Sequence, residues 1–193
     1  MNKIDEYKAL LEGILDEYRY IHTLNVADSA RELAKLYGED EDKAYLAGLL
    51  HDIMKNTDKN KQLQIIQKDD IILSESEKNN PKLWHAMAGA SYVKLELKIS
   101  DEQIINAVRY HTTGRAKMSK FEKIIYIADF ISAERNYPDV DVMRKLSQIS
   151  LEKAALYALK FSISKLAKDG LVIHTDSVEF YNELICERIN IND

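Results

Sequence analysis

Five histidines and a few carboxylates carry most of the chemical potential of this 193-residue chain. His51 and Asp52 stand side by side directly after the apolar stretch 45–50, which predicts two ligand-capable side chains at the end of a buried helix. Such a position holds the backbone rigid while both side chains reach one pocket. The dipeptide alone is common by chance, and by itself it favours an ordinary helix end in which His51 interacts with the helix dipole.

Further polar residues extend this pair into a set. Arg19 and His22 are three residues apart and therefore share one face of a helix. His85 opens another helical segment, and His111 closes one. The set, rather than any single member, predicts a site.

Asp129 is the most informative single residue of the set. It lies in an otherwise apolar helical segment, 124–131, so its carboxylate is expected to point into the interior. A buried carboxylate must be paired or bound to a metal, because an unpaired one costs several kcal/mol or becomes neutral.

The elements that must position these residues are all predicted to be helices. Only 6 Gly and 2 Pro occur in the chain, so few tight turns are available. Apolar residues recur at three- and four-residue intervals, and no segment reads as a strand. The sequence therefore predicts a single-domain, all-α bundle over residues 1–193 with nine or ten helices. The expected helices are 4–18, 20–37, 41–50, 62–68, 83–97, 102–111, 121–132, 140–146, 151–168 and 176–188, with loops at 55–60 and 74–81.

Helix ends follow from residues that cap helices. Gly38 and Gly170 are expected to end helices, because glycine adopts the left-handed conformation required there. Asp40, Ser100 and Asp176 are expected to begin helices by accepting hydrogen bonds from free backbone N–H groups.

Composition excludes several classes of function. The 27 Lys and Arg against 32 Asp and Glu give a net charge of −5, which argues against nucleic acid as a partner. No apolar run approaches the ~18 residues needed to span a membrane. The N-terminal residues are too acidic for a signal peptide, and the single cysteine, Cys186, forms no internal disulfide. A cytoplasmic location is expected.

In chain order, His22, His51-Asp52 and Asp129 resemble the H…HD…D pattern of the HD-domain metal-dependent phosphohydrolases, an all-helical superfamily. The strings RYIH, HDIMK, WHA, HTTG and ADFISAER look like the YqeK-type branch, the symmetrical bis(5'-nucleosyl)-tetraphosphatases. The resemblance covers residues 19–182. It implies a motif core at about 19–135 and C-terminal helices that complete a nucleotide pocket.

The resemblance implies a hydrolase that splits diadenosine tetraphosphate into two ADP by attack of a metal-bound hydroxide. The implied metal ligands are His22, His51, Asp52 and Asp129. Iron is the implied ion, and imidazole and carboxylate ligands also suit manganese, cobalt or zinc. One metal is favoured, although a second at His85 and His111, bridged by Asp52, stays open.

The remaining site residues also come from the resemblance. The implied catalytic residues are Asp52, Lys55, His85 and His111, with the two histidines donating hydrogen bonds or a proton. The implied substrate-binding residues are Arg19, Lys55, His85, His111, Arg135, Gly170, His174 and Thr175. Trp84 and Tyr110 flank site histidines and either stack on adenine or simply pack in the core.

Several alternatives stay open at this point. A nucleotide phosphatase or a guanosine tetraphosphate hydrolase would share the metal motif. Lys55 and Asn56 stand where the latter has acidic residues, which counts against it. A non-catalytic nucleotide sensor would also keep the ligands. The expected partner is a small dinucleoside polyphosphate, with an apolar stripe along 151–166 available for a homodimer.

Overall fold

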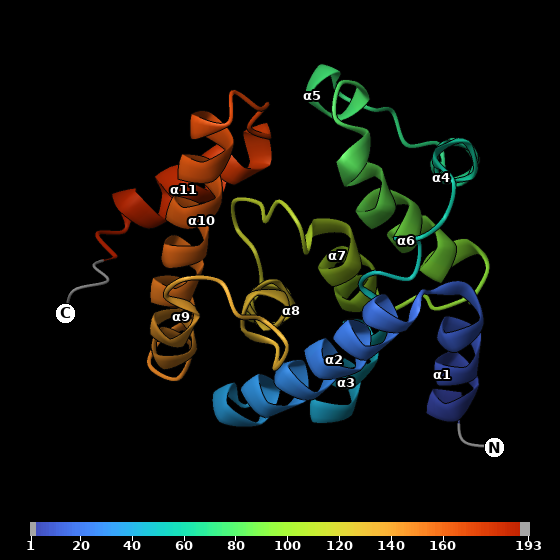
Figure 1. Ribbon diagram of the computed structural model, residues 1–193, viewed down its shortest axis with the longest axis horizontal. Coiled ribbons are helices and arrows are strands. Elements are labelled where there is room, and N and C mark those ends of the chain that lie inside the picture. Colours follow the sequence, from blue (N-terminus) through green and yellow to red (C-terminus); the bar gives the residue numbers. More distant parts are fainter. Residues whose placement is uncertain (1–2, 190–193) are drawn as a thin grey trace.

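The computed structural model describes residues 3–189, and this part of the chain is all helical, as the sequence predicts (Figure 1). Residues 3–189 form eleven α-helices and one short 3-10 helix, without a strand. The elements are α1 (Lys3–Ile14), α2 (Glu17–Tyr37), α3 (Glu41–Leu50), α4 (Lys59–Lys68), α5 (Glu75–Lys78), η1 (Pro81–Leu83), α6 (Trp84–Leu95), α7 (Glu102–Tyr110), α8 (Lys120–Ile131), α9 (Val140–Ser147), α10 (Leu151–Lys168) and α11 (Thr175–Cys186).

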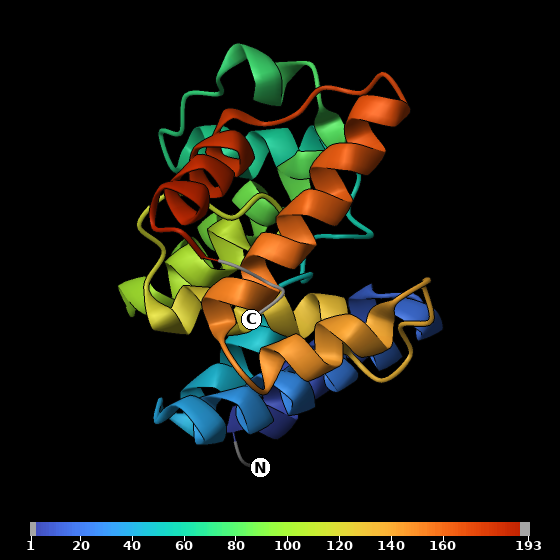
Figure 2. The ribbon, with the colours of Figure 1, turned by 90° about the vertical axis from the view of Figure 1, so that its left-hand side faces the viewer.

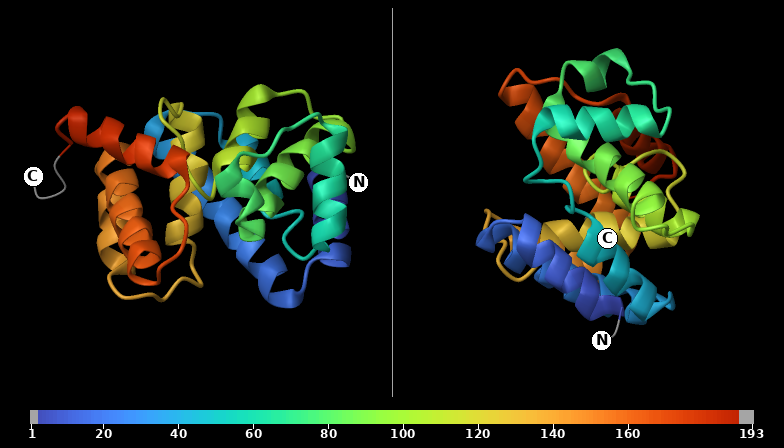
Figure 3. Two further views of the ribbon diagram at one scale, coloured as in Figure 1. Left: turned by 90° about the horizontal axis from the view of Figure 1, so that it is seen from above. Right: turned by 90° about the vertical axis from the view of Figure 1, so that its right-hand side faces the viewer.

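The helices form a base and two walls. At the base, α2 packs against α3 and α8 (Figures 1 and 2). On one side α6 packs against α7 and α4, and on the other α10 packs against α8, α9 and α11. Figure 3 shows α9, α10 and α11 at one end of the molecule and α1 and α4 at the other. Within the described residues, no helix combines the length and apolar character needed to cross a membrane.

The crossing of α2 and α3 is the tightest helix contact that bears on the site. A Cβ atom on Gly48 would lie 2.8 Å from the Cα atom of Ala27, so only glycine permits this approach. Leu49 and Leu50 are fully buried beside it. Because α3 ends at Leu50, the crossing brings the residues that follow, His51 and Asp52, against α2.

Most predicted helix ends are confirmed, and two caps differ from the prediction. Gly38 ends α2 with a φ of 70°, and Asp40 begins α3. The cap of α7 is Asp101 rather than Ser100, because the Asp101 carboxylate accepts from the backbone N–H groups of the first turn. The cap of α11 is His174 rather than Asp176, whose backbone N–H donates to the His174 ring.

Three segments differ from the predicted elements. The loop predicted at 55–60 is shorter, because the Asp58 side chain accepts from Asn60 N and α4 begins at Lys59. Residues 74–81, predicted as a loop, contain α5, because Ser74 and Glu77 form a reciprocal capping box. This helix raises the count to eleven. The first predicted helix ends early, since Asp16 caps α2 and places Tyr18 in α2 with 57 % of its surface exposed.

The apolar stripe of α10 lies inside the protomer rather than on its surface. The first part of the stripe, from Leu151 to Leu159, is buried where α10 packs on α8 and α9. Later residues of the helix line a pocket. The expected dimer interface along 151–166 is therefore largely occupied by internal contacts.

Candidate metal centre and substrate pocket

Side chains carried by five helices or by the residues directly after them, α2, α3, α6, α7 and α8, meet at one buried point. Asp52 and the four histidines of the set are each at most 2 % exposed. The Nε2 atoms of His22 and His51 lie 3.3 Å apart, as do those of His85 and His111. We refer to the following residues as the histidine cluster: His22, His51, His85, His111, Asp52 and Asp129.

The Nδ1 atom of each histidine, on the side of the ring away from the cluster, has a hydrogen-bond partner of its own. The Nδ1 atoms of His51, His85 and His111 face the carbonyl oxygens three residues earlier, at 2.6, 2.7 and 2.8 Å. A carbonyl only accepts, so each Nδ1 carries the hydrogen and each Nε2 presents a lone pair to the cluster. His22 differs, since its Nδ1 faces the carboxylate of Glu134.

Both aspartates of the cluster approach the Nε2 atom of His22. Asp129 Oδ1 is 3.2 Å from His22 Nε2, and Asp52 Oδ2 is 3.9 Å from it. Asp52 is buried, whereas 20 % of the Asp129 side chain is exposed. The predicted inward orientation of Asp129 is thus modified, because its carboxylate faces a pocket rather than closed core.

Protonation in the cluster follows from burial and charge. Burial lowers the pKa of His51 to about 3 and that of His85 to about 4, so both rings are neutral at pH 7. Burial also disfavours the charged form of His22, but Asp129 and Glu134 outweigh it and raise the pKa of His22 to about 9. Burial opposes ionisation of Asp129, yet hydrogen bonding to His22 and the charge of Arg135 hold its pKa well below the usual range.

The cluster fits a divalent metal ion. Two overlapping groups have ligand atoms within 4.8 Å of one another: His22, His51 and Asp129, and His51, Asp52 and His111. Asp52 Oδ1 is buried and has no hydrogen-bond partner among the described residues. The Nε2 lone pairs of the neutral His51 and His85 rings and the Asp52 oxygen, which accepts no hydrogen bond from a described residue, converge here, and a cation bound among them would stabilise this arrangement.

Lys55 supplies a cation on one side of the cluster. Its Nζ atom donates to His85 Nε2 at 2.9 Å and lies 3.4 Å from Asp52 Oδ1. Thr112 adds a hydroxyl 2.9 Å from His111 Nε2. In this arrangement the Nε2 atoms of both histidines accept hydrogen bonds, whereas the family resemblance implies that they donate hydrogen bonds or a proton.

Two arginines from the predicted set contact the aspartates. Arg19 Nη1 donates to Asp52 Oδ2 at 3.2 Å. Arg135 donates through Nη2 to the Asp129 carboxylate and through Nε to the Asp129 carbonyl, the latter at 2.8 Å. About 30 % of each arginine side chain is exposed, so both reach from the solvent toward the cluster.

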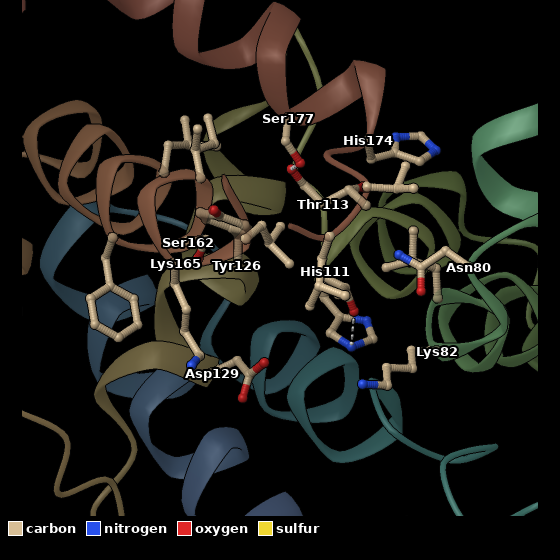
Figure 4. Close-up of a pocket in the computed structure, with 18 of the residues that line it drawn as sticks. Asn80, Lys82, His111, Thr113, Tyr126, Asp129, Ser162, Lys165, His174 and Ser177 are labelled. Atoms are coloured by element: carbon tan, nitrogen blue, oxygen red, sulfur yellow. Dashed lines mark hydrogen bonds between the residues drawn. The ribbon is translucent and has the colours of Figure 1, made fainter. Parts of the chain in front are cut away.

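A pocket of about 680 Å³ opens beside the cluster (Figure 4). His85, His111 and Asp129 form its floor, and Asn79 to Leu83 form one rim. The opposite side is formed by the pocket-lining residues between 159 and 177, which we call the C-terminal wall. In Figure 4, Lys165 lies on one side of His111 and Asp129, and Lys82 lies on the other.

Of the three residues predicted in this part of the chain, two line the pocket and one does not. Gly170 lines the pocket and has a φ of 65°. His174 also lines it, and its Nδ1 accepts from Asp176 N at 3.2 Å while its buried Nε2 has no hydrogen-bond partner among the described residues. Thr175 is exposed on α11 and is not among the pocket-lining residues, because the first turn of that helix aims it outward. Ser177 lines the pocket instead.

The aromatic side chains at the pocket are not the expected ones. Trp84 donates to the Glu77 carbonyl, Tyr110 is covered by two arginines, and neither is among the pocket-lining residues. Tyr137 and Phe161 line the pocket instead, with ring centroids 5.1 Å apart. Phe161 belongs to the predicted apolar stripe of α10, but only the folded chain shows that this part of the stripe faces a pocket.

Glu134, the partner of His22, was not among the residues predicted from the sequence. It lies in the ADFISAER string beside Arg135, which was singled out. A carboxylate in a loop after a site helix is too common to identify without the fold.

The chain is similar to known proteins over almost its whole length. The HD domain family matches residues 19–134 of the chain. The "Bis(5'-nucleosyl)-tetraphosphatase, symmetrical" of Bacillus subtilis (strain 168) is 39% identical over 185 residues, covering 96% of this chain and 98% of that protein. The protein of the same name from Halalkalibacterium halodurans is 40% identical over 183 residues, covering 93% of this chain and 95% of that protein.

A solved structure is similar over nearly the whole chain. The crystal structure of a "predicted HD superfamily hydrolase involved in NAD metabolism" from Clostridium acetobutylicum superposes with a TM-score of 0.93 at 38% sequence identity. The superposition covers 97% of this chain and 99% of that one.

Proposed function

Because this chain belongs to the HD domain family, we propose that it is a metal-dependent hydrolase that cleaves diadenosine tetraphosphate symmetrically into two ADP. The observation that carries the proposal is a buried histidine cluster that opens on a pocket with cationic side chains on both sides. The named relatives, which match almost the full chain, support the choice of substrate.

We propose that one metal ion is held by His22, His51, Asp52 and Asp129, with iron as the favoured ion. The donor set of imidazole and carboxylate fits iron, manganese, cobalt or zinc. When bound, such an ion acts as a Lewis acid on a phosphoryl oxygen and lowers the pKa of water. The position of the Lys55 ammonium beside His85 and Asp52 favours one metal over two.

Cationic side chains of the protein would neutralise the negative charge of the substrate. The tetraphosphate bridge is highly anionic, and the protein carries a net charge of −5. Arg19, Lys55 and Arg135 reverse the sign locally, since a partly enclosed cation acts strongly over a few ångströms whereas surface charges are screened beyond about 10 Å. In the reaction, Lys55 and Arg135 would stabilise charge on the attacked phosphates.

The histidines of the pocket floor act as acceptors. His85 and His111 have their Nδ1 hydrogens committed to backbone carbonyls, so their Nε2 atoms orient Lys55 and Thr112 rather than donate protons. Lys55, which carries hydrogens and lies at the pocket, is the group suited to protonate the leaving ADP. Asp52, which contacts Arg19 through one carboxylate oxygen and lies near Lys55 with the other, would orient the attacking water.

Cleavage at the centre of the substrate fits the shape of the pocket. Lys165 and Lys82 lie on opposite sides of the cluster floor, so each half of a tetraphosphate centred there meets one lysine (Figure 4). Tyr137 and Phe161 offer an aromatic surface for one nucleobase. Gly170 and His174 of the C-terminal wall complete that side, so the helices after residue 135 would finish the nucleotide pocket.

Product analysis tests the proposal. The metal-loaded protein is incubated with diadenosine tetraphosphate, and the nucleotides are separated by anion-exchange chromatography. ADP as the only product supports symmetrical cleavage. ATP with AMP, or no turnover with iron, manganese, cobalt and zinc each added in turn, would refute it. Guanosine tetraphosphate and nucleoside monophosphates are assayed separately as substrates, to test the two alternative phosphohydrolase activities.

A further inference from the structure

His22 differs from the other three histidines in what holds its ring. His51, His85 and His111 each donate Nδ1–H to a neutral carbonyl three residues earlier in the chain. His22 donates to a carboxylate that lies 112 residues away, that of Glu134. The fold therefore gives one ligand histidine an anionic partner.

Glu134 is itself firmly placed. Ser132 Oγ donates to its Oε1 at 2.7 Å, and Asn25 Nδ2 donates to its Oε2 at 2.7 Å. Only 15 % of its side chain is exposed. With His22, three donors from α2 and the 132–134 loop converge on the two carboxylate oxygens.

The loop that carries Glu134 is clamped from α9. Arg144 donates to the carbonyl oxygens of Ile131, Ser132 and Arg135, at 3.2, 3.1 and 3.0 Å. These bonds fix the backbone on both sides of Glu134. Its carboxylate is thus held by side chains and by backbone at once.

We propose that Glu134 is a positioning residue that locks His22 as a metal ligand and strengthens metal binding at the His22, His51 and Asp129 group. Glu134 lies behind the ring at Nδ1, while Nε2 faces His51 and Asp129. A carboxylate that accepts Nδ1–H fixes the tautomer and makes Nε2 a better donor to a metal. The inference rests on the metal site of the proposed function and not on the identity of the substrate.

Zinc binding to substitution variants tests this role. Glu134→Ala removes the acceptor, and metal affinity is expected to fall about 10- to 100-fold, as for other partners of ligand histidines. Glu134→Gln keeps one acceptor for His22 and loses the charge, while Asn25 can rotate its amide to match. Its affinity should lie between those of wild type and Glu134→Ala.

A matched control removes a similar carboxylate elsewhere. Glu152 accepts from Lys123 at 2.9 Å and from Ser150, and it lies outside the histidine cluster. Glu152→Gln should bind zinc like wild type. Affinities are measured on chelator-treated protein by competition with a chromophoric chelator, and circular dichroism confirms that each variant is folded.

Ring-nitrogen NMR adds a readout that a merely structural role would not change. In zinc-loaded wild type, His22 should show a protonated Nδ1 and a metal-bound Nε2. In Glu134→Ala this signature should weaken while that of His51 persists. Zinc affinity of Glu134→Ala within twofold of wild type would overturn the proposal, and if that variant does not fold, the same limit applied to Glu134→Gln decides. Because no nucleotide is present, failure of the proposed substrate would leave this result unaffected.

Discussion

The histidine cluster and the C-terminal wall border the same pocket but are held in different ways. In the cluster, the Nδ1 atom of every histidine ring has a hydrogen-bond partner, and the rings are almost completely buried. In the wall, Leu171 and Val172 are 49 % and 46 % exposed, and Phe161 is 37 % exposed. The cluster therefore has a fixed geometry, whereas the wall exposes apolar side chains that a ligand could contact.

This contrast matches what each region would do. Metal ligands must keep their geometry to within a fraction of an ångström, which requires burial and support from behind. A nucleoside is bound mainly through contact area, which tolerates small movements. We therefore expect substitutions in the cluster to abolish chemistry and those in the wall to weaken binding.

The largest effect is expected for Asp129→Ala. This change removes a carboxylate that faces His22 and Arg135, so metal content and turnover should both be lost. Several kcal/mol of transition-state stabilisation by a metal corresponds to a fall in kcat/KM of roughly a thousandfold or more. Metal is measured by elemental analysis after gel filtration, and ADP release gives the rate.

Asp42→Ala is the control, because this surface carboxylate is 93 % exposed and, among the residues that the structure describes, pairs with Arg31 alone. It should retain metal and activity. Retention of both by Asp129→Ala as well would show that the cluster does not hold the metal.

A smaller effect is expected for Lys55→Ala. The variant should bind one metal ion but lose about 100-fold in kcat, because a preorganised charge donor is worth roughly that much in the transition state. Lys55→Arg should recover part of the rate. The measurement is kcat under saturating substrate, together with metal content.

Lys59→Ala serves as the comparison, since Lys59 pairs with Gln62 one turn further along the chain. A Lys55→Ala enzyme with wild-type kcat would remove this lysine from the chemistry. Two bound metals in that variant would instead show that its ammonium had excluded a second ion.

The cluster was largely predictable from the sequence, whereas in the wall only Gly170 and His174 had been named. Ligand residues at helix ends leave a local signal, because His51-Asp52 follows an apolar helix and Asp129 interrupts one. All six cluster residues were identified in this way or through the family resemblance, and the structure brings them together. The helical fold was predictable for the same reason, since periodicity is a local property.

The wall depends on how distant elements pack. Phe161 lies on an apolar helix face that predicted a dimer interface, and only the packing of α10 on α8 turns that face toward the pocket. Glu134 and His22 are 112 residues apart, so no local pattern connects them. The family resemblance implied His174 as a substrate-binding residue, but its role as the cap of α11 required the backbone geometry.

A binding effect of intermediate size is expected for Phe161→Ala. Stacking of a base on an aromatic ring contributes about 1 to 3 kcal/mol, so KM should rise roughly tenfold or more while kcat changes little. Phe161→Trp should keep KM near wild type. Ile149→Ala, a change at a 68 % exposed residue outside the pocket, is the control. A loss confined to kcat would mean that the wall shapes the chemistry and is not merely a contact surface.

The smallest effect is expected at His174, where two functions can be separated. Its Nδ1 caps α11, and its buried Nε2 lies 3.6 Å from Glu77 Oε1 at the pocket. His174→Ala should lower the free energy of unfolding by about 1 kcal/mol through loss of the cap, as thermal denaturation would measure. His174→Asn restores a capping oxygen but not the Nε2 donor, so stability should return while KM stays about threefold raised, the value of one neutral hydrogen bond. Thr175→Ala, the control, should change KM and the free energy of unfolding by less than the His174 variants do. If His174→Asn has wild-type KM, this residue only holds the helix, and substrate contacts in the C-terminal wall come from its apolar and aromatic side chains.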